Sequence, residues 1–288
     1  MLVRLDAHDM CLKLDPAAGG SVRAFNHRDL EILRPGPLRT SPAFDPLQFA
    51  AFPMVPFVGR IHHGVFNADG KEITLPPNLP PEPHAIHGQG WRDAWTIDSQ
   101  TETSATLLYK HQADVWPWAY EARQVFSLET DAFCVDLSVK NLGQSPMPAG
   151  LGWHPYFHRK DAELKVPTRV VWTPNADTGE NLPGRIPNQI DLIQTRKVET
   201  LNLDTTFSLA EPIMRISWPT HSVELVSDPL FHHATIYVPP GEDYFCAEPI
   251  SHAPNSVNSD LSPDVTGQKW LAPGETLSGR IRLTIERS

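Results

Sequence analysis

The frequency of proline constrains the fold of this chain more than any other feature of its sequence. The sequence contains 29 prolines in 288 residues, and they are spread along its whole length. This is about twice the average usage of proline. Proline lacks a backbone N–H and its ring clashes with the preceding helical turn, so such a distribution interrupts long helices. We therefore expect few, short helices and a chain built mainly from strands and loops.

Alternation of apolar and polar residues supports β structure. Apolar side chains occupy every second position of 133–139 and again of 281–285, with mostly polar residues between them. A period of two places successive side chains on opposite faces of a strand. Both segments are therefore predicted as half-buried strands, and the second closes the domain.

Turn residues between apolar runs indicate how the strands are connected. Asp-Gly at 69–70 and Thr-Asp at 130–131 each separate two apolar runs, as in β-hairpins. The proline-rich stretch 76–83 is predicted as a rigid loop, and neither a repeat nor a composition shift marks a domain boundary. The fold class predicted is all-β, a single large antiparallel β-sandwich domain spanning residues 1–288.

Charge and hydropathy exclude several classes of function. The net charge of -10 leaves no basic stripe for phosphate backbones, which argues against nucleic acid and against an anionic membrane as partner. No stretch approaches the roughly 20 apolar residues of a membrane span. The first ten residues include Arg4, Asp6 and Asp9, where a signal peptide would be apolar. We expect a cytoplasmic protein whose partner is a small, neutral molecule.

The three cysteines give no sign of a disulfide framework. Cys11, Cys134 and Cys246 are far apart in the sequence and form no C-x-x-C pair. They are predicted to be buried free thiols.

Five segments place an ionisable residue in an apolar or Gly/Pro-rich context, where chemistry is more informative than on an exposed strand face. They are residues 52–61, 84–91, 150–157, 203–207 and 245–252.

In this order, the five segments resemble the aldose 1-epimerase (galactose mutarotase) family over nearly the whole chain. The resemblance is strongest to the bacterial branch that reads F-P-x-V-P-x-x-x-R-I and then H-x-x-H-G-x-G-W, here residues 52–61 and 84–91. It implies a galactose mutarotase-like β-supersandwich with an open sugar cleft, acting as a monomer or homodimer on a small-molecule sugar.

Carried over by position, the resemblance makes Glu248 the general base, His154 the general acid and His87 a second imidazole at the sugar ring oxygen. Arg60 and Asp204 would hold sugar hydroxyls. Anomers interconvert when a base removes the proton of the C1 hydroxyl while an acid protonates the ring oxygen, which opens the ring to an aldehyde. A carboxylate and an imidazole suit this exchange near neutral pH, and no metal or organic cofactor is required.

Two further candidates flank His87, and two positions depart from the family pattern. His84 and Trp91 are candidate substrate-binding residues. Core packing is the commoner role of tryptophan, but Trp91 follows the His87–Gly88 loop and is the tryptophan expected to stack on a sugar face. The residue before the family arginine is often Asn, but it is Gly59 here, and residues 205–206 also differ from the family, so sugar preference stays open.

Other functions remain as alternatives. His84 and His87 have an H-x-x-H spacing that suits a metal, and His62, His63, His232 and His233 add further imidazoles. These four histidines and His252 are otherwise expected at the cleft rim or on the surface, and their roles stay open. The same scaffold serves hexose-6-phosphate 1-epimerases, which need cationic side chains near the cleft. A glycoside hydrolase that uses Asp204 and Glu248, and a catalytically silent sugar-binding protein, are the remaining hypotheses.

Overall fold

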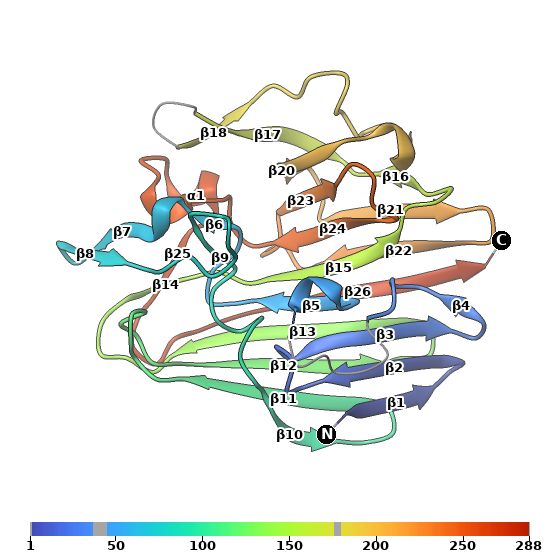
Figure 1. Cartoon of the computed structure of the whole chain (residues 1–288), viewed down its shortest axis with the longest axis horizontal. Coiled ribbons are helices and arrows are strands. Elements are labelled where there is room, and N and C mark those ends of the chain that lie inside the picture. The colour runs from blue at the N-terminus through green and yellow to red at the C-terminus, as the bar shows by residue number, and fades with distance from the viewer. Residues whose placement is uncertain (1, 37–44, 176–179, 288) are drawn as a thin grey trace.

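Short strands joined by loops make up most of the computed structural model, which describes residues 2–36, 45–175 and 180–287 (Figure 1). Within these residues the only α-helix is α1 (Pro263–Thr266), and single 3₁₀ turns occur at Pro46–Gln48, His62–Gly64, Val198–Thr200 and Ser256–Asn258. The expectation of few and short helices is confirmed. None of the described helices has the length and apolar character needed to traverse a lipid bilayer.

One large sheet carries the residues of interest. Its path is β1-β2-β3-β5-β15-β24-β23-β20-β17-β18, with β4 beside β3, and Figure 1 shows it from bottom to top. Its strands are β1 (Val3–Ala7), β2 (Met10–Asp15), β3 (Ser21–His27), β4 (Leu30–Glu31), β5 (Ala51–Met54), β15 (Gly152–His158), β17 (Thr168–Pro174), β18 (Asn181–Gly184), β20 (Leu203–Leu209), β23 (His233–Val238) and β24 (Tyr244–Ile250).

The second large sheet follows the path β10-β11-β12-β13-β26-β22-β21-β16-β19. Its strands are β10 (Thr96–Gln100), β11 (Ser104–His111), β12 (Tyr120–Leu128), β13 (Ala132–Asn141), β16 (Glu163–Lys165), β19 (Arg196–Lys197), β21 (Ile213–Trp218), β22 (His221–Ser227) and β26 (Thr276–Arg287). Three small pairs complete the described strands, namely β6 (Arg60–Ile61) with β9 (Ala85–Ile86), β7 (Val65–Ala68) with β8 (Lys71–Thr74), and β14 (Met147–Ala149) with β25 (Lys269–Leu271).

The two large sheets share one apolar core. Phe25 of β3 and Phe133 of β13 lie with ring centroids 4.6 Å apart, and Phe133 also contacts Trp153 of β15. Every ladder between described strands is antiparallel, which confirms the predicted antiparallel β-sandwich.

The segments predicted as strands and turns take those roles. Residues 133–139 lie in β13 and 281–285 in β26, and residues 69–70 and 130–131 connect paired strands. Residues 76–83 lie between β8 and β9 without strand or helix. Cys134 is an exception to the predicted alternation of β13. It lies on the face opposite Phe133, where exposed side chains were expected, but it is fully buried, as Phe133 is.

Alternation along the central strands separates the core from the functional face. In β15, Trp153 and Phe157 belong to the main core, whereas Tyr156 belongs to a smaller apolar cluster on the opposite face. In β24, Phe245 and Cys246 divide between the two clusters in the same way. Polar side chains of these strands that avoid the main core therefore share one face of the large sheet.

Candidate active site

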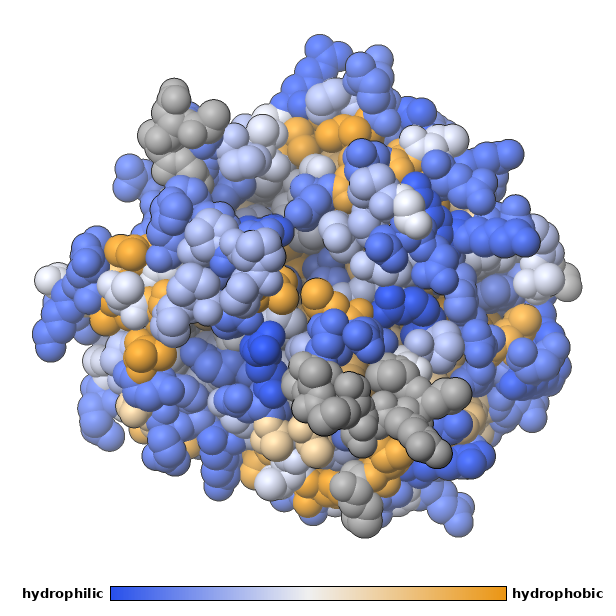
Figure 2. All heavy atoms as spheres, viewed as in Figure 1, coloured by the Kyte–Doolittle hydropathy of each residue, from blue (hydrophilic) through white to orange (hydrophobic). Residues whose placement is uncertain are grey.

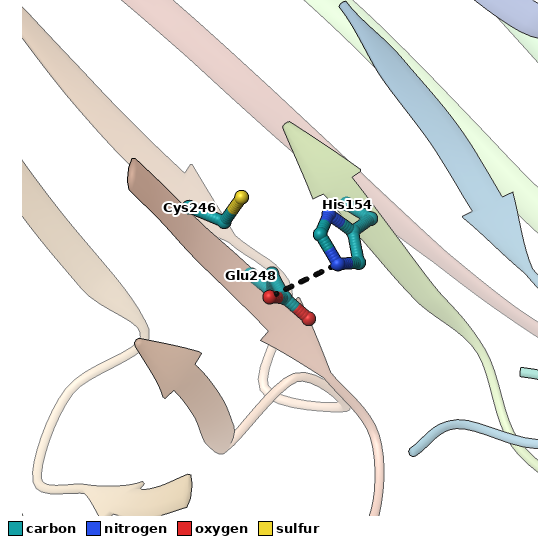
Figure 3. Close-up of side chains that lie close together, drawn as sticks. All are labelled: His154, Cys246 and Glu248. Carbon is teal, nitrogen blue, oxygen red and sulfur yellow. Dashed lines mark ion pairs between the residues drawn. The ribbon is translucent and has the colours of Figure 1, made fainter. Parts of the chain in front are cut away.

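The pairing of β15 with β24 brings His154 and Glu248 together. Tyr156 lies opposite Cys246 and Gly152 opposite Ile250, so the same antiparallel register places His154 opposite Glu248. The His154 Nε2 and Glu248 Oε1 atoms are 3.3 Å apart, and Figure 3 shows the two side chains reaching toward each other from neighbouring strands. Directly opposite residues of antiparallel strands are the closest cross-strand neighbours, which accounts for this contact.

Burial controls the charge of this pair, which we call the dyad. Glu248 is 3% exposed and His154 is 6% exposed. Burial, followed by the nearby charge of Asp204, raises the pKa of the Glu248 carboxyl well above its ordinary value. Burial lowers the pKa of His154 to about 3. Both shifts favour the neutral forms, a protonated carboxyl and an uncharged imidazole. The carboxyl proton is therefore the one that the two side chains can exchange.

The dyad lies in a row of side chains that crosses the large sheet. Successive strand registers place Phe52 beside His154, Glu248 beside Thr235, Thr235 beside Thr206, and Thr206 beside Trp172. The hydroxyls of Thr206 and Thr235 are 2.8 Å apart. The neighbouring row places Asp204 opposite Tyr237, and Tyr237 opposite Cys246. Residues far apart in the sequence therefore share one polar strip.

His87 approaches the dyad from the loop that follows β9. Its φ is 58°, in the left-handed region, and Gly88 follows with a φ of 72°. A Cβ on Gly88 would lie 2.1 Å from the carbonyl oxygen of Val55, so only glycine fits there. The backbone N–H of Gly59 donates to His87 Nδ1 at 3.2 Å. Burial lowers the pKa of His87 well below its ordinary value. The ring is therefore neutral with its proton on Nε2, which is a hydrogen-bond donor.

Arg60 and Asp204 form an ion pair next to the dyad. Arg60 donates two hydrogen bonds to Glu82, at 3.1 and 3.3 Å, and one to Asp204 at 3.3 Å. Burial disfavours the charged form of Arg60, but the two carboxylates together outweigh burial, so the pKa of Arg60 is raised. The two residues predicted to hold sugar hydroxyls are thus in direct contact.

A cleft of about 260 Å³ opens over these residues, and we call it the dyad cleft. Its predicted lining residues are Arg60, His87, His154, Asp204 and Glu248. The middle of the face in Figure 2 is hollowed and surrounded by mostly hydrophilic side chains. Five of the seven predicted site residues therefore line one cleft.

The other two predicted residues lie outside this cleft. Trp91 is fully buried, donates its indole N–H to the carbonyl of Gly88, and packs against Phe52 and His87. Because neither face of its ring is exposed, Trp91 cannot serve as a stacking platform for a sugar. It packs against the loop that carries His87 and stabilises that loop. His84 stacks on His62, with ring centroids 4.9 Å apart, and lines an adjoining hollow.

Sequence reasoning missed several residues of the cleft. Tyr156, Tyr237 and Tyr244 contribute to its lining. Arg34, which does not itself line the cleft, lies between the rings of Tyr156 and Tyr244, 4.3 and 4.4 Å from their centroids. Tyr156 stands two residues after His154, so strand periodicity applied to the motif would have found it.

Among the other histidines, His233 and His252 are buried and do not lie at the cleft rim or on the surface as expected. Val58 N–H donates to His252 Nε2 at 3.3 Å, and His252 Nδ1 lies 2.9 Å from the Ser256 hydroxyl, so His252 supports the chain next to Gly59. His232 and His233 have rings 4.1 Å apart, and His233 is fully buried with Nδ1 3.0 Å from the Ser208 hydroxyl.

Among the described residues, the donor group with metal-compatible spacing differs from the H-x-x-H pair. The ligand atoms of His154, Cys246 and Glu248 all lie within 4.8 Å of one another, and Figure 3 shows them on β15 and β24. Burial, and then the charge of Glu248, raises the pKa of the Cys246 thiol well above its ordinary value. Burial therefore favours the protonated thiol at neutral pH. Neither His84 nor His87 belongs to this group.

Comparison with known proteins agrees with the fold and the segment order. The family model described as aldose 1-epimerase matches residues 4–284. This chain belongs to the aldose 1-epimerase family. It is 30% identical over 293 residues to the uncharacterized protein YphB of Escherichia coli K12, with 96% of each chain covered. It is 29% identical over 234 residues to the uncharacterized protein YihR of the same organism, covering 75% of this chain and 74% of YihR.

Solved structures from this fold group match this family member along its full length. A crystal structure from Escherichia coli K12 has a TM-score of 0.88 at 28% identity, covering 100% of this chain and 99% of that one. A galactose mutarotase-like protein from Clostridium acetobutylicum has a TM-score of 0.88 at 20% identity, with 100% and 95% covered. At that identity, the second match shows the fold alone. The predicted mutarotase-like fold is confirmed.

The structure of this aldose 1-epimerase family member explains one departure from the usual motif. Gly59, where the family often has Asn, has a φ of 62°. Glycine adopts this left-handed conformation without strain, and asparagine is among the few other residues that tolerate it. Backbone geometry at this position is therefore compatible with both glycine and asparagine.

Proposed function

We propose that this protein is an aldose 1-epimerase (mutarotase) that interconverts the α and β anomers of a free aldose. The observation that carries the proposal is the contact between a buried carboxyl and a buried imidazole, Glu248 and His154, on the floor of the dyad cleft. Ring opening needs two proton carriers that act on the C1 hydroxyl and the ring oxygen. These oxygens are bonded to the same carbon, so two carriers in direct contact suit them.

In this mechanism, the dyad moves one proton in each direction without a change of net charge. Transfer of the shared proton from Glu248 to His154 gives a carboxylate base and an imidazolium acid. Glu248 then removes the C1 hydroxyl proton while His154 protonates the ring oxygen, and the C1–ring oxygen bond breaks to give the aldehyde. Rotation about the C1–C2 bond and reclosure with the roles reversed give the other anomer. Such proton transfer contributes about 10²- to 10⁴-fold in rate.

The surrounding residues have positioning roles in the proposal. His87 donates from Nε2 to the ring oxygen, because its Nδ1 already accepts from Gly59. Arg60 and Asp204 are hydrogen-bonded to each other at the cleft. When a sugar binds, both would form hydrogen bonds to its hydroxyls in addition to, or in place of, this contact. Removal of water by the bound ring would strengthen these contacts.

A phosphorylated sugar is the weaker alternative. Among the described residues that line the dyad cleft, Arg60 is the only arginine or lysine, and Glu82 and Asp204 already pair with it. A phosphate dianion would need additional cations. An uncharged aldose is therefore favoured.

Polarimetry of freshly dissolved α-anomers tests the proposal. The parent protein should exceed the spontaneous rate for at least one aldose of a panel, and Glu248→Gln and His154→Asn should each lower kcat by about 10²- to 10⁴-fold. If the parent exceeds the spontaneous rate with no aldose, the protein is a silent sugar-binding member of the family instead.

A further inference from the structure

Cys246 lies beside the dyad and has no part in the chemistry described above. Cys246 and Glu248 are two residues apart on β24, so both side chains point to the same face of the sheet, which His154 reaches from β15. A ring nitrogen of His154, the sulfur of Cys246 and a carboxyl oxygen of Glu248 all lie within 4.8 Å of one another (Figure 3). Nitrogen, sulfur and oxygen ligands therefore converge from two paired strands.

The spacing of these three atoms is close to that of a tetrahedral zinc site. Zinc binds nitrogen and oxygen at about 2.0 to 2.2 Å and sulfur at about 2.3 Å, so neighbouring ligand atoms of a tetrahedron lie about 3.3 to 3.6 Å apart. The distance between His154 Nε2 and Glu248 Oε1 is already 3.3 Å. A shift of the Cys246 sulfur by about 1 Å would therefore complete a set of three ligands.

The charge of the ligand set also suits a buried zinc ion. Zn²⁺ that binds here displaces the thiol proton of Cys246 and the carboxyl proton of Glu248, and both protons pass to the solvent. A dication bound to one thiolate, one carboxylate and one neutral imidazole has no net charge. Burial of the complex therefore avoids the large cost of an isolated buried charge. The nearby charges of Arg34 and Asp204 have opposite signs, so their effects on the site oppose each other.

The ligand types and the cleft determine which ions can bind and how they enter. Thiolate and imidazole favour zinc and its softer analogue cadmium, whereas Mg²⁺ and Ca²⁺ favour oxygen ligands. His154 and Glu248 line the dyad cleft, so an ion can enter from the cleft. Three protein ligands leave a fourth coordination position for water, and this position would face the cleft.

We infer that His154, Cys246 and Glu248 form a binding site for zinc, and that zinc bound there inhibits the enzyme reversibly. The ion would take the place of the proton that Glu248 and His154 exchange, because the lone pairs that accept this proton are the ones that bind the metal. The zinc site itself goes beyond the proposed mutarotase function, whereas the inhibition rests on that function.

Polarimetry with and without zinc tests the inhibition. The parent protein is first freed of metal with EDTA and dialysed. Zinc at about ten times its measured Kd should then lower the mutarotation rate by about tenfold, and EDTA should restore the rate. Magnesium at the same concentration is the control and should leave the rate unchanged. A rate that zinc leaves unchanged or raises would overturn the inhibition.

Cysteine variants locate the site. Cys246→Ala should lower the affinity for zinc by about 100-fold or more, since loss of an outer partner of a metal ligand alone costs about 10- to 100-fold. Each rate with zinc is compared with the rate of the same protein without zinc, so a change in the basal rate does not affect the result. Cys134→Ala, fully buried on β13 of the other large sheet, and Cys11→Ala, half-buried on β2, are the matched controls and should keep the sensitivity of the parent. Equal sensitivity of Cys246→Ala and the parent would overturn the site.

Cadmium binding measures the site without catalysis. A cadmium–thiolate bond gives a charge-transfer absorption in the ultraviolet, which should appear when equimolar cadmium is added to the parent and be absent in Cys246→Ser, a variant that keeps the size of the side chain. If this signal is present but the parent turns over no sugar, the mutarotase proposal fails and the metal site stands. If turnover is present and the signal is absent, or is equal in Cys246→Ser, the metal site fails.

Discussion

Glu248→Gln should separate the catalytic effect of this carboxyl from its effect on stability. Glutamine keeps the size and hydrogen-bonding capacity of the side chain but cannot exchange a proton in the mechanism. A loss of about 10²- to 10⁴-fold in kcat corresponds to about 3 to 5 kcal/mol in the activation barrier. The same substitution should stabilise the protein at neutral pH, because the ionised form of a buried carboxyl is unfavourable.

The pH dependence of this stabilisation follows from the raised pKa of Glu248. Below its ordinary value of 4.5, the folded and the unfolded parent both carry the proton, and the contribution to stability is fully present. Above that pH, the unfolded chain releases the proton while the folded protein keeps it. The parent therefore loses about 1.36 kcal/mol per pH unit until the pH reaches the folded pKa. Glutamine does not titrate, so the variant escapes this loss.

Urea denaturation of parent and variant at pH 4.5, 5.5, 6.5 and 7.5 measures the difference in the free energy of unfolding. The difference should be smallest at pH 4.5 and increase in favour of Glu248→Gln at each step. Glu72→Gln, an exposed substitution on β8, is the matched control and should show no such trend. A difference that is constant with pH would refute the protonated state of Glu248, and full activity of the variant would refute its role as base.

Four further predictions test the remaining features. Burial lowers the pKa of His233 to about 2 and of His252 to about 4, so each contributes stability that is fully present above pH 6.5 and lost as the pH falls, by about 1.36 kcal/mol per pH unit. The urea midpoint of the parent should drop between pH 6.5 and 4.5, and the drop should be smaller in His233→Asn. An equal drop in parent and variant would show that His233 does not contribute to it. His87→Phe keeps the ring but removes the Nε2 donor, and polarimetry should show a loss of about tenfold in kcat/KM, whereas an unchanged value would exclude a contact with the sugar. Trp91→Ala should destabilise the fold by about 3 to 5 kcal/mol in urea, and a loss of sugar affinity at unchanged stability would contradict its packing role. Dialysis against EDTA should leave the rate unchanged, and a loss that added zinc reverses would assign a catalytic metal.

The sequence predicted the strands better than their partners. Alternation located β13 and β26, and turn residues located two hairpins, because these signals are local. The pairing of β15 with β24 joins segments far apart in the chain, and the period of two is the same in every strand. Only the resemblance to the family indicated that His154 and Glu248 belong to one site.

The places of Trp91 and His84 relative to the dyad cleft depend on side-chain direction. Trp91 follows the His87 segment closely in sequence, yet the turn at Gly88 and the hydrogen bond from its indole direct the ring into the apolar cluster below. His84 lies before the same turn and lines the hollow that adjoins the dyad cleft, together with Arg60 and Asp204. Spacing within a motif does not specify these directions, since they depend on backbone angles that the surrounding loops impose.

The register between β15 and β24 is the physical basis of the site. In that register His154 lies opposite Glu248, and the core residue Phe157 lies opposite Phe245. A slip of one residue would bring Ala247 opposite His154 and turn Glu248 toward the main core, because adjacent residues of a strand face opposite sides. An unpaired carboxyl in that core would cost several kcal/mol, so the packing of Phe157 and Phe245 against the second sheet holds the register. The same apolar contacts that stabilise the sandwich therefore keep Glu248 and His154 in contact, as the proposed mechanism requires.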